Sequence, residues 1–273
     1  MLLDARCKRE TPLTDDKVIT EWNAMFLSTL TEAAAALENT EWLAAAEAGA
    51  EFLVENLRVD GTWMRSWHAK TGAGTHGFGG DYAWLVDMFT RLGEATGKAR
   101  WRALANDTAE ELLEQFWDEE TAAVCTTSVN GEQLLVRQKD LFDGAMPSIN
   151  SAGAHALLRL GLLNDNRTFI DRAERAVRGV SKVLVGHPTA FGNYFAVIDL
   201  LVNTPTVTVV VGDHADLVSA TQIAYLPRNL LLWGEKDENG NWEGKSDGAY
   251  VCQQQTCGPV VSDAEELLRV LQQ

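Results

Sequence analysis

Apolar residues recur every three or four positions along most of the first two hundred residues, as at Trp22 and Phe26. This spacing is typical of amphipathic helices. It predicts seven helices, over about 18–33, 40–57, 81–95, 98–116, 149–163, 167–184 and 188–201. Thr14, Asp15 or Asp16 is expected to cap the first of them, because a side-chain oxygen there can accept from a free backbone amide.

The helices come in pairs, and each of the first two pairs is followed by a turn and a short extended segment. These extended segments lie at 59–67 and 118–127. The unit of helix, helix and extended arm therefore repeats after about 60 residues. Such a repeat indicates an array of helical hairpins.

The pattern changes in the last quarter of the chain. Residues 206–212 form a β-branched run, T-V-T-V-V-V-G, which is typical of a strand buried on both faces. A helix and a second strand complete a predicted β-α-β unit over 206–233, and a last helix is expected at 263–271. We therefore divide the chain into a helical part, 1–203, and a small α/β appendage, 204–273.

Composition limits the classes of function. The chain has 273 residues, of which 46% are hydrophobic, so it can bury a large core. Its net charge of −16 argues against nucleic acid or an acidic membrane as a partner and favours a neutral or small substrate. We find neither a secretory leader nor an apolar run of bilayer length, and four cysteines are too few for a disulfide framework. A cytoplasmic protein is expected.

Two short motifs bear on metals, thiols and cofactors. Cys252 and Cys257 have four residues between them, which matches neither paired zinc ligands nor a C-x-x-C redox motif, so no metal site is predicted. A structural or reversible thiol pair is one interpretation, and two separate buried cysteines is the favoured one. Gly212 and Asp213 follow a predicted strand, but one glycine is no dinucleotide fingerprint, so no cofactor is predicted.

The stretch from Asp140 to Leu158 joins a polar loop to a helix rich in small residues, D-L-F-D-G-A-M-P-S-I-N-S-A-G-A-H-A-L-L. Ser148, Asn150 or Ser151 can cap this helix. The remaining amides and the positive end of the helix dipole can hold a polar ligand, together with the nearby acidic side chains. Alternatively, these residues only cap and space a structural helix.

Four sequence motifs carry a family resemblance. They are D-D-K-V-I-T-E-W-N at 15–23, D-Y-A-W-L at 81–85, D-G-A-M-P-S-I-N-S at 143–151 and Y-V-C-Q-Q-Q-T-C-G-P at 250–259. In this order, and over nearly the whole chain, they resemble the C-terminal part of the family typified by spermatogenesis-associated protein 20 and its YyaL-type bacterial relatives. Members of that family combine a thioredoxin-like domain with an α/α toroid similar to six-hairpin glycosidases and sugar epimerases, followed by a short α/β tail.

The resemblance implies a mainly α fold, a partial α/α toroid of helical hairpins with a small C-terminal α/β appendage. We expect this chain to lack the thioredoxin-like domain and to begin within the toroid, because about seven helices are predicted where a closed ring needs about twelve. An open arc would expose apolar surface where the ring is interrupted. We therefore predict either a homo-oligomer or a separate chain that completes the toroid.

In α/α toroids, ligands bind at the mouth formed by the starts of the inner helices. The resemblance places there Asp16, Trp22, Asn23, Arg65, Trp67, Asp81, Tyr82, Asp143, Ser148 and Asn150. Carboxylates, amides and indole rings suit a small carbohydrate. Glycoside cleavage needs two carboxyl groups, and Asp81 and Asp143 are the predicted catalytic pair. The alternative is that each of these acids caps its helix.

Two functions are compatible with these residues. The first is a carbohydrate-active protein of the six-hairpin glycosidase type that hydrolyses or epimerises a sugar in the toroid mouth. An epimerase would more often use histidine bases, and His68, His76 and His155 are available, although His155 lies in mid-helix and is expected in the core or an interface. The second is a non-catalytic scaffold that pairs with a thioredoxin-like partner or with itself. The sequence leaves open whether the chain is an enzyme.

Overall fold

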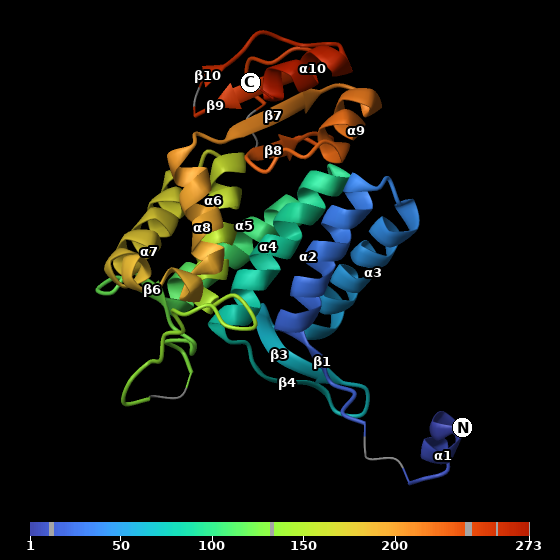
Figure 1. Ribbon diagram of the computed structural model, residues 1–273, viewed down its shortest axis with the longest axis vertical. Helices are drawn as coiled ribbons and strands as arrows, with labels where there is room; N and C mark the ends of the chain where they lie inside the picture. The colour runs from blue at the N-terminus through green and yellow to red at the C-terminus, as the bar shows by residue number, and fades with distance from the viewer. Residues whose placement is uncertain (11–13, 132–133, 238–241, 255, 273) are drawn as a thin grey trace.

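The computed structural model of the chain describes residues 1–10, 14–131, 134–237, 242–254 and 256–272. Within this part, the helices between Thr20 and Val202 lie in two rows (Figure 1). The inner row contains α2 (Thr20–Ala36), α4 (Gly79–Thr96), α6 (Ile149–Leu163) and α8 (Gly192–Val202). The outer row contains α3 (Thr40–Leu57), α5 (Ala99–Phe116) and α7 (Arg167–Gly186).

Helices α2, α4 and α6 each pack on the next inner helix and on the outer helix that follows them in the chain. Small residues allow this close approach. A Cβ atom at Gly161 of α6 would lie 3.1 Å from the backbone of Asn166 and of Ile170, at the start of α7. Aromatic rings fill the space between the rows, where Phe89 of α4 lies 5.8 Å from the ring of Trp63 and 5.8 Å from that of Trp101. The predicted array of helical hairpins is confirmed.

Short strands connect the hairpins at one end of the rows (Figure 1). Strand β3 (Thr62–His68) pairs antiparallel with β1 (Val18–Ile19), β2 (Arg58–Val59) and β4 (Gly72–His76). After the second hairpin, β5 (Trp117–Asp118) pairs with β6 (Ala123–Val124). The extended arms expected from the repeat are therefore small antiparallel sheets, and they carry Arg65 and Trp67 to the starts of the inner helices.

The C-terminal unit lies at the opposite end of the rows (Figure 1). It contains β7 (Thr206–Val211), α9 (Ala215–Ile223), β8 (Asn229–Leu232), β9 (Gly248–Gln253), β10 (Thr256–Cys257) and α10 (Ala264–Leu271). The sheet order is β10-β9-β7-β8, with β7 and β8 parallel. The predicted β-α-β unit is confirmed, and β9 adds an antiparallel strand on the other side of β7.

Hydrogen bonds join this unit to the helical rows. The side chain of Glu94, at the end of α4, accepts from the backbone amide of Leu231 in β8 (3.1 Å), and its backbone oxygen accepts from Trp233 Nε1 (2.6 Å). Arg102 of α5 is buried and donates through Nε to Asp237 Oδ2 (2.6 Å). The end of α4 is therefore held by the C-terminal sheet. The exact division at residues 203 and 204 stays a prediction, because α8 ends at Val202 and β7 begins at Thr206.

Several expected helix starts are wrong. A helix, α1 (Leu2–Cys7), occupies part of the segment expected to be turn-like. Helix α2 begins at Thr20 with Ile19 at its N-cap, so the predicted cap at Thr14, Asp15 or Asp16 is wrong, because Val18 and Ile19 between them are paired with β3. Helix α4 begins two residues before Asp81. A 3-10 turn over Pro188–Ala190 precedes α8, which therefore starts later than the proline suggested.

None of the helices that the structure describes is long and apolar enough to span a membrane.

Candidate functional site

The start of α4 holds the first of the two predicted catalytic acids. Asp81 is buried, and its Oδ1 accepts from the backbone amide of Glu21 (2.9 Å) and from Arg65 Nη1 (2.9 Å). Its Oδ2 accepts from the backbone amide of Phe78 (2.8 Å). Arg65 Nη1 also donates to Glu21 Oε2 (2.6 Å). One carboxyl group thus links α4 to α2 and to the β3 arm.

Burial alters the acidity of this group. It raises the pKa of Asp81 to about 6, although the positive charge of Arg65 and the backbone donors act in the opposite direction. The pKa of Arg65 is raised above its ordinary value, because the attraction of Asp81 and Glu21 outweighs the effect of burial. A carboxyl group with a pKa near 6 can give or take a proton close to neutral pH.

The start of α6 holds the second acid. Asp143 Oδ1 accepts from the backbone amide of Ser148 (2.8 Å) and from Ser151 Oγ (2.5 Å), and its Oδ2 accepts from the backbone amide of Asn193 in α8 (2.7 Å). Ser148 is the N-cap of α6, and its hydroxyl accepts from the backbone amide of Ser151 (3.1 Å). Capping by Ser148 is thereby confirmed. Both predicted catalytic acids make helix-end contacts, and their catalytic role stays a prediction.

Two further predicted residues hold the arms in place. Asn150 is buried, accepts from the backbone amide of Val124 (2.6 Å) and donates to the backbone oxygen of Val124 (2.9 Å). The hydroxyl of buried Tyr82 accepts from the backbone amide of Trp63 in β3 (3.3 Å). These contacts attach β6 to α6 and β3 to α4.

The remaining predicted residues lie around the start of α2. Asp16 Oδ1 contacts His68 Nε2 (2.8 Å), and Asn23 Nδ2 donates to the backbone oxygen of Ile19 (2.8 Å). Trp67 packs edge-on against Phe52, with ring centroids 5.1 Å apart. Trp22 is 58% exposed. A solvent-facing indole ring is therefore present in the first turn of α2.

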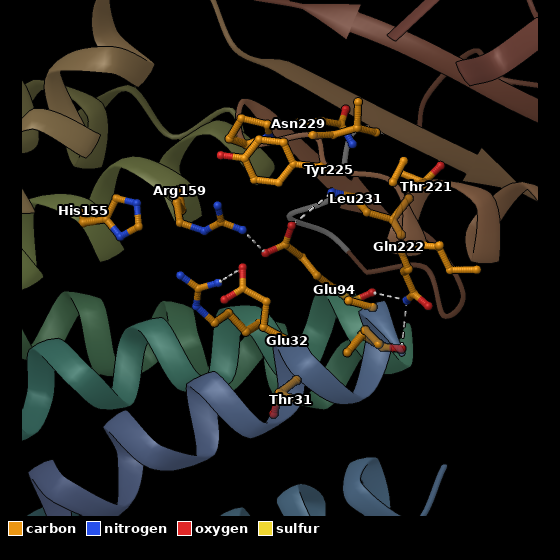
Figure 2. A pocket seen from close by; sticks show the side chains of 18 residues that line it. Thr31, Glu32, Glu94, His155, Arg159, Thr221, Gln222, Tyr225, Asn229 and Leu231 are labelled. Carbon is orange, nitrogen blue, oxygen red and sulfur yellow. Dashed lines mark hydrogen bonds and ion pairs between the residues drawn. The ribbon is translucent and has the colours of Figure 1, made fainter. Parts of the chain in front are cut away.

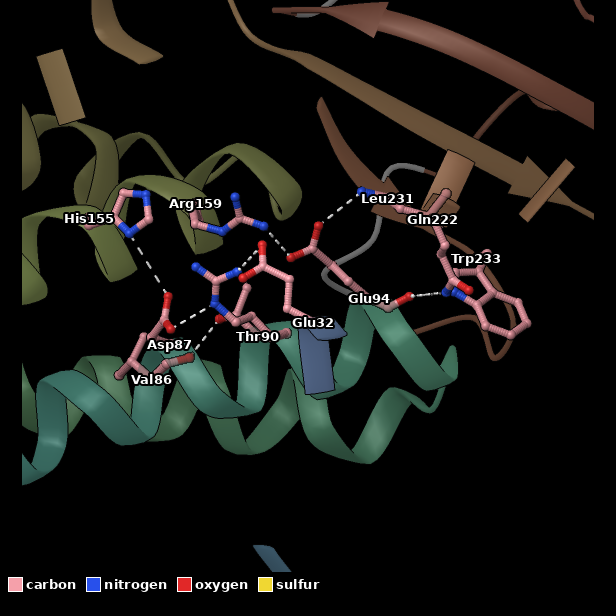
Figure 3. A network of polar contacts seen from close by, with 11 residues as sticks. Glu32, Val86, Asp87, Thr90, Glu94, His155, Arg159, Gln222, Leu231 and Trp233 are labelled. Carbon is pink, nitrogen blue, oxygen red and sulfur yellow. Dashed lines mark hydrogen bonds and ion pairs between the residues drawn. The ribbon is translucent and has the colours of Figure 1, made fainter. Parts of the chain in front are cut away.

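The sequence patterns missed a second polar group, which lies further along the inner helices. Arg91 of α4 donates through Nε to Asp87 Oδ2 (2.8 Å), and its Nη1 lies 2.8 Å from Glu32 Oε1 of α2. His155 Nδ1 of α6 lies 4.0 Å from Asp87 Oδ1. Figure 3 shows Asp87 of α4 with the side chain of His155 of α6 pointing towards it. Three helices thus contribute charged or titratable side chains to one network.

The same network continues towards the C-terminal unit. Arg159 Nη2 of α6 donates to Glu94 Oε2 of α4 (2.6 Å). Because Glu94 Oε1 accepts from Leu231, the network reaches the C-terminal sheet (Figure 3). Acid-base pairs four residues apart, as Asp87 and Arg91 are, could have revealed it, since such pairs share one helix face.

Burial and the neighbouring charges together set the protonation states of Asp87 and His155. Burial alone would raise the pKa of Asp87, but the positive charge of Arg91, aided by His155 and Arg159, lowers it to about 2. Burial lowers the pKa of His155 to about 4, which outweighs the attraction of Asp87. At neutral pH the carboxylate is therefore ionised and the imidazole is neutral. His155 is only partly buried, with its side chain 18% exposed, and it lies in the wall of a polar cavity and not in the core.

Two cavities border this network. The smaller encloses about 180 Å³ and is lined by Ser28, Thr29, Glu32, Trp84, Asp87, Arg91, Ala152, His155 and Asn193. The larger encloses about 550 Å³ and lies between α2, α4 and α6 on one side and the α9–β8 connection on the other (Figure 2). Glu32, Arg91 and His155 line both cavities, which we together call the inner-face groove.

Several polar atoms along the groove are buried without a hydrogen-bond partner in the described part of the chain. Ser28 Oγ and Asp87 Oδ1 are such atoms at the smaller cavity, and Thr31 Oγ1 and Arg159 Nε at the larger. Buried polar groups in folded proteins are normally paired. These four are therefore unpaired polar groups within the walls of the groove.

The structure joins Cys252 and Cys257 in a disulfide. The favoured interpretation as separate buried cysteines is wrong, because β9 and β10 pair these two residues directly opposite each other. Among the residues that the structure describes, no group of three or more His, Cys, Asp or Glu side chains is arranged to hold a metal ion.

Comparison with known proteins places the chain among the relatives that its motifs suggested. No family model matches it. It is 27% identical to spermatogenesis-associated protein 20 of Homo sapiens over 99% of its length, and 26% identical to an uncharacterized protein of Caenorhabditis elegans over 98%. The chain spans 38% and 39% of those two proteins. It is homologous to spermatogenesis-associated protein 20 over its whole length.

Solved structures share the helical rows. An unsaturated glucuronyl hydrolase from Bacillus sp. GL1 matches with a TM-score of 0.50 and 19% identity, over 64% of this chain and 50% of that one. A sugar epimerase from a ruminal bacterium matches with a TM-score of 0.52 and 12% identity, over 62% and 46%. A GH76 alpha-mannanase from Bacteroides thetaiotaomicron matches with a TM-score of 0.51 and 12% identity, over 63% and 44%. The fold is that of α/α-toroid glycosidases and epimerases.

Proposed function

We propose that this protein binds a small carbohydrate in the inner-face groove and acts on it as a glycosidase. The observation that carries the proposal is the pair of unpartnered atoms, Ser28 Oγ and Asp87 Oδ1, at the smaller cavity. Trp84 and Asn193 line the same cavity and add an indole ring and an amide. Sugars combine hydroxyl groups with apolar ring faces, so this set of groups suits them.

Asp81 and Asp143 are the proposed acid and base. Asn193 both lines the smaller cavity and donates its backbone amide to Asp143, so this carboxylate lies beside the groove. The pKa of Asp81, raised to about 6 by burial, suits a proton donor at neutral pH. Epimerisation is less well supported, because the pKa of His155, near 4, makes it a weak base.

The other predicted mouth residues would shape the entrance. Trp22 presents an exposed ring, and Arg65 holds Asp81 in place. The rest of the proposed binding set is Asp16, Asn23, Trp67, Tyr82, Ser148 and Asn150. In this arrangement the sugar enters past Trp22 and lies along α4, between the two acids and the network of Asp87.

A binding and activity assay tests the proposal. Monosaccharides and disaccharides are screened by thermal shift, since a ligand that binds the folded state raises the melting temperature. Asn193→Ala should abolish the shift, because it removes an amide from the cavity. Asn106→Ala is the matched control, because Asn106 lies on the outer helix α5, donates to Glu110 of the same helix and does not line the groove. Asp81→Asn and Asp143→Asn should retain binding and stop hydrolysis. A screen without any shift would refute the proposal.

A second candidate function is a scaffold that pairs with itself or with a separate chain. Exposed aromatic rings on the two end helices of the inner row favour it: Trp22 and Phe26 on α2, and Phe195 on α8. Exposed apolar patches of this kind often mark interfaces. Sedimentation velocity tests it, since Phe26→Glu should convert an oligomer to a monomer, and a wild-type monomer at all concentrations would exclude self-association.

A further inference from the structure

The carboxylate partners of Arg91 differ in their access to solvent. Asp87 lies behind the guanidinium group and its side chain is 5% exposed, whereas the side chain of Glu32 is 66% exposed. The Arg91 side chain itself is 14% exposed. An ion pair with one exposed partner contributes little to stability, so Glu32 can leave Arg91 at small cost, while Asp87 cannot.

Glu32 also lies at the junction of the two cavities. Figure 2 shows its side chain on the α2 side of the larger cavity, with Arg159 on the α6 side. Both residues, with Arg91, line that cavity. A ligand that fills the groove therefore meets the Glu32 carboxylate before it meets the guanidinium group behind it.

We propose that the groove takes a sugar that carries a carboxylate, which replaces Glu32 on Arg91. This inference rests on the proposed function and names its substrate class. The exchange conserves charge, because one carboxylate moves into solvent while another takes its place on the same guanidinium group. Two parallel N–H···O bonds to a carboxylate are the geometry that guanidinium favours. The Glu32 carboxylate competes with the sugar carboxylate for Arg91. A neutral sugar has no group that would displace Glu32.

The remaining residues of the network favour a ligand with one negative charge over a ligand with two. Glu94 is held by Arg159 (2.6 Å) and by the Leu231 amide (3.1 Å), so it stays in the cavity wall when Glu32 leaves. Asp87 stays on Arg91. A phosphate with nearly two charges would therefore meet two fixed carboxylates, which repel it. Arg159 Nε and Thr31 Oγ1 belong to residues that line the larger cavity and are buried without hydrogen-bond partners in the described chain.

The test compares D-glucuronate with D-glucose, which differ only in the group at C6, and with glucose 6-phosphate. Titration calorimetry is run on the full chain and on Glu32→Gln, with Glu41→Gln as the control for general charge, because Glu41 is exposed on α3. We expect glucuronate to bind at least about tenfold more tightly than glucose. Glu32→Gln should strengthen glucuronate binding by about three- to tenfold and leave glucose binding unchanged. Glu41→Gln should change neither.

Each other result has a definite meaning. Equal binding of glucuronate and glucose, or tighter binding of the phosphate, would overturn the carboxylate assignment and leave the proposed function intact. Weaker or unchanged glucuronate binding in Glu32→Gln would show that Glu32 is no competitor and would likewise overturn it. Failure of all three sugars to bind would overturn this inference, whereas the proposed function is refuted only if the wider thermal-shift screen also shows no ligand.

Discussion

The two polar regions of the inner helices are held together in different ways. At the helix starts, Asp81 and Asp143 accept mostly from backbone amides and short polar side chains. Further along the same helices, Asp87 and Arg91 pair as full charges inside the row. The carboxylates at the helix starts connect helices and strands through their backbone amides. The charged residues around Arg91 contact one another through side chains that line the cavities.

This difference teaches which region can respond to a ligand. Backbone donors cannot move without moving a helix, so the helix-start carboxylates are fixed. Side-chain partners can exchange, and the region around Arg91 has one exposed partner and several unpartnered atoms. We therefore expect the helix starts to govern the shape of the site and the Arg91 region to govern what it binds.

The largest expected effect is that of removing the buried acid of the charged region. Asp87→Ala leaves the partly buried Arg91, whose side chain is 14% exposed, with the exposed Glu32 carboxylate, and losing one partner of a buried ion pair costs up to about 3–5 kcal/mol of unfolding free energy. Urea denaturation measures this loss. The double variant Asp87→Leu with Arg91→Met should recover most of it, because a well-packed apolar pair replaces the ion pair. A double variant as unstable as Asp87→Ala would show that the charges themselves stabilise this region.

A smaller loss is expected at the helix starts. Asp143→Ala removes the acceptor of three donors, two backbone amides and the Ser151 hydroxyl, and should lower the free energy of unfolding by about 2–3 kcal/mol. Asp143→Asn retains one acceptor oxygen and should lose less. Asp171→Ala, on the exposed face of α7, is the control and should change stability by less than about 0.5 kcal/mol. Equal losses in Asp143→Ala and the control would contradict a structural role for Asp143.

The sequence predicts the first region better than the second for a physical reason. A cap is a local feature, so the polar residues ahead of an apolar segment predict a cap at Ser148, Asn150 or Ser151, and Ser148 is the one that forms it. The network around Arg91 depends on which helices are neighbours, and no local pattern tells that Glu32 of α2 meets Arg91 of α4. The Cys252–Cys257 disulfide depends in the same way on the register of β9 and β10.

Acid should affect the two regions in opposite directions. The pKa of Asp81 is about 6 when folded, above the value of about 4 in an unfolded chain, so its contribution to stability rises as the pH falls from about 6 to about 4. The pKa of His155 is about 4 when folded, below the unfolded value of about 6.5, so stability is lost as the pH falls through this interval. The two effects largely cancel in the wild type.

Removing either group should uncover the other effect. Between about pH 7 and about pH 4.5, Asp81→Asn should lose about 2 kcal/mol more than the wild type, and His155→Gln should lose about 2 kcal/mol less. Urea denaturation at both pH values measures the differences. If both variants followed the wild-type pH dependence, neither group would carry the pKa shift described above.

The smallest expected effect on stability is that of the exposed ring at the mouth. Trp22→Ser should change the free energy of unfolding by less than about 0.5 kcal/mol, because the ring is 58% exposed and its loss leaves no large cavity. The effect of Trp22→Ser on sugar affinity shows whether the sugar contacts the helix starts or only the inner-face groove. A loss of about tenfold would show that an indole at the helix starts stacks on the sugar, since such contacts contribute about 1–2 kcal/mol. Unchanged affinity, combined with a strong effect of Asn193→Ala, would restrict the binding site to the inner-face groove.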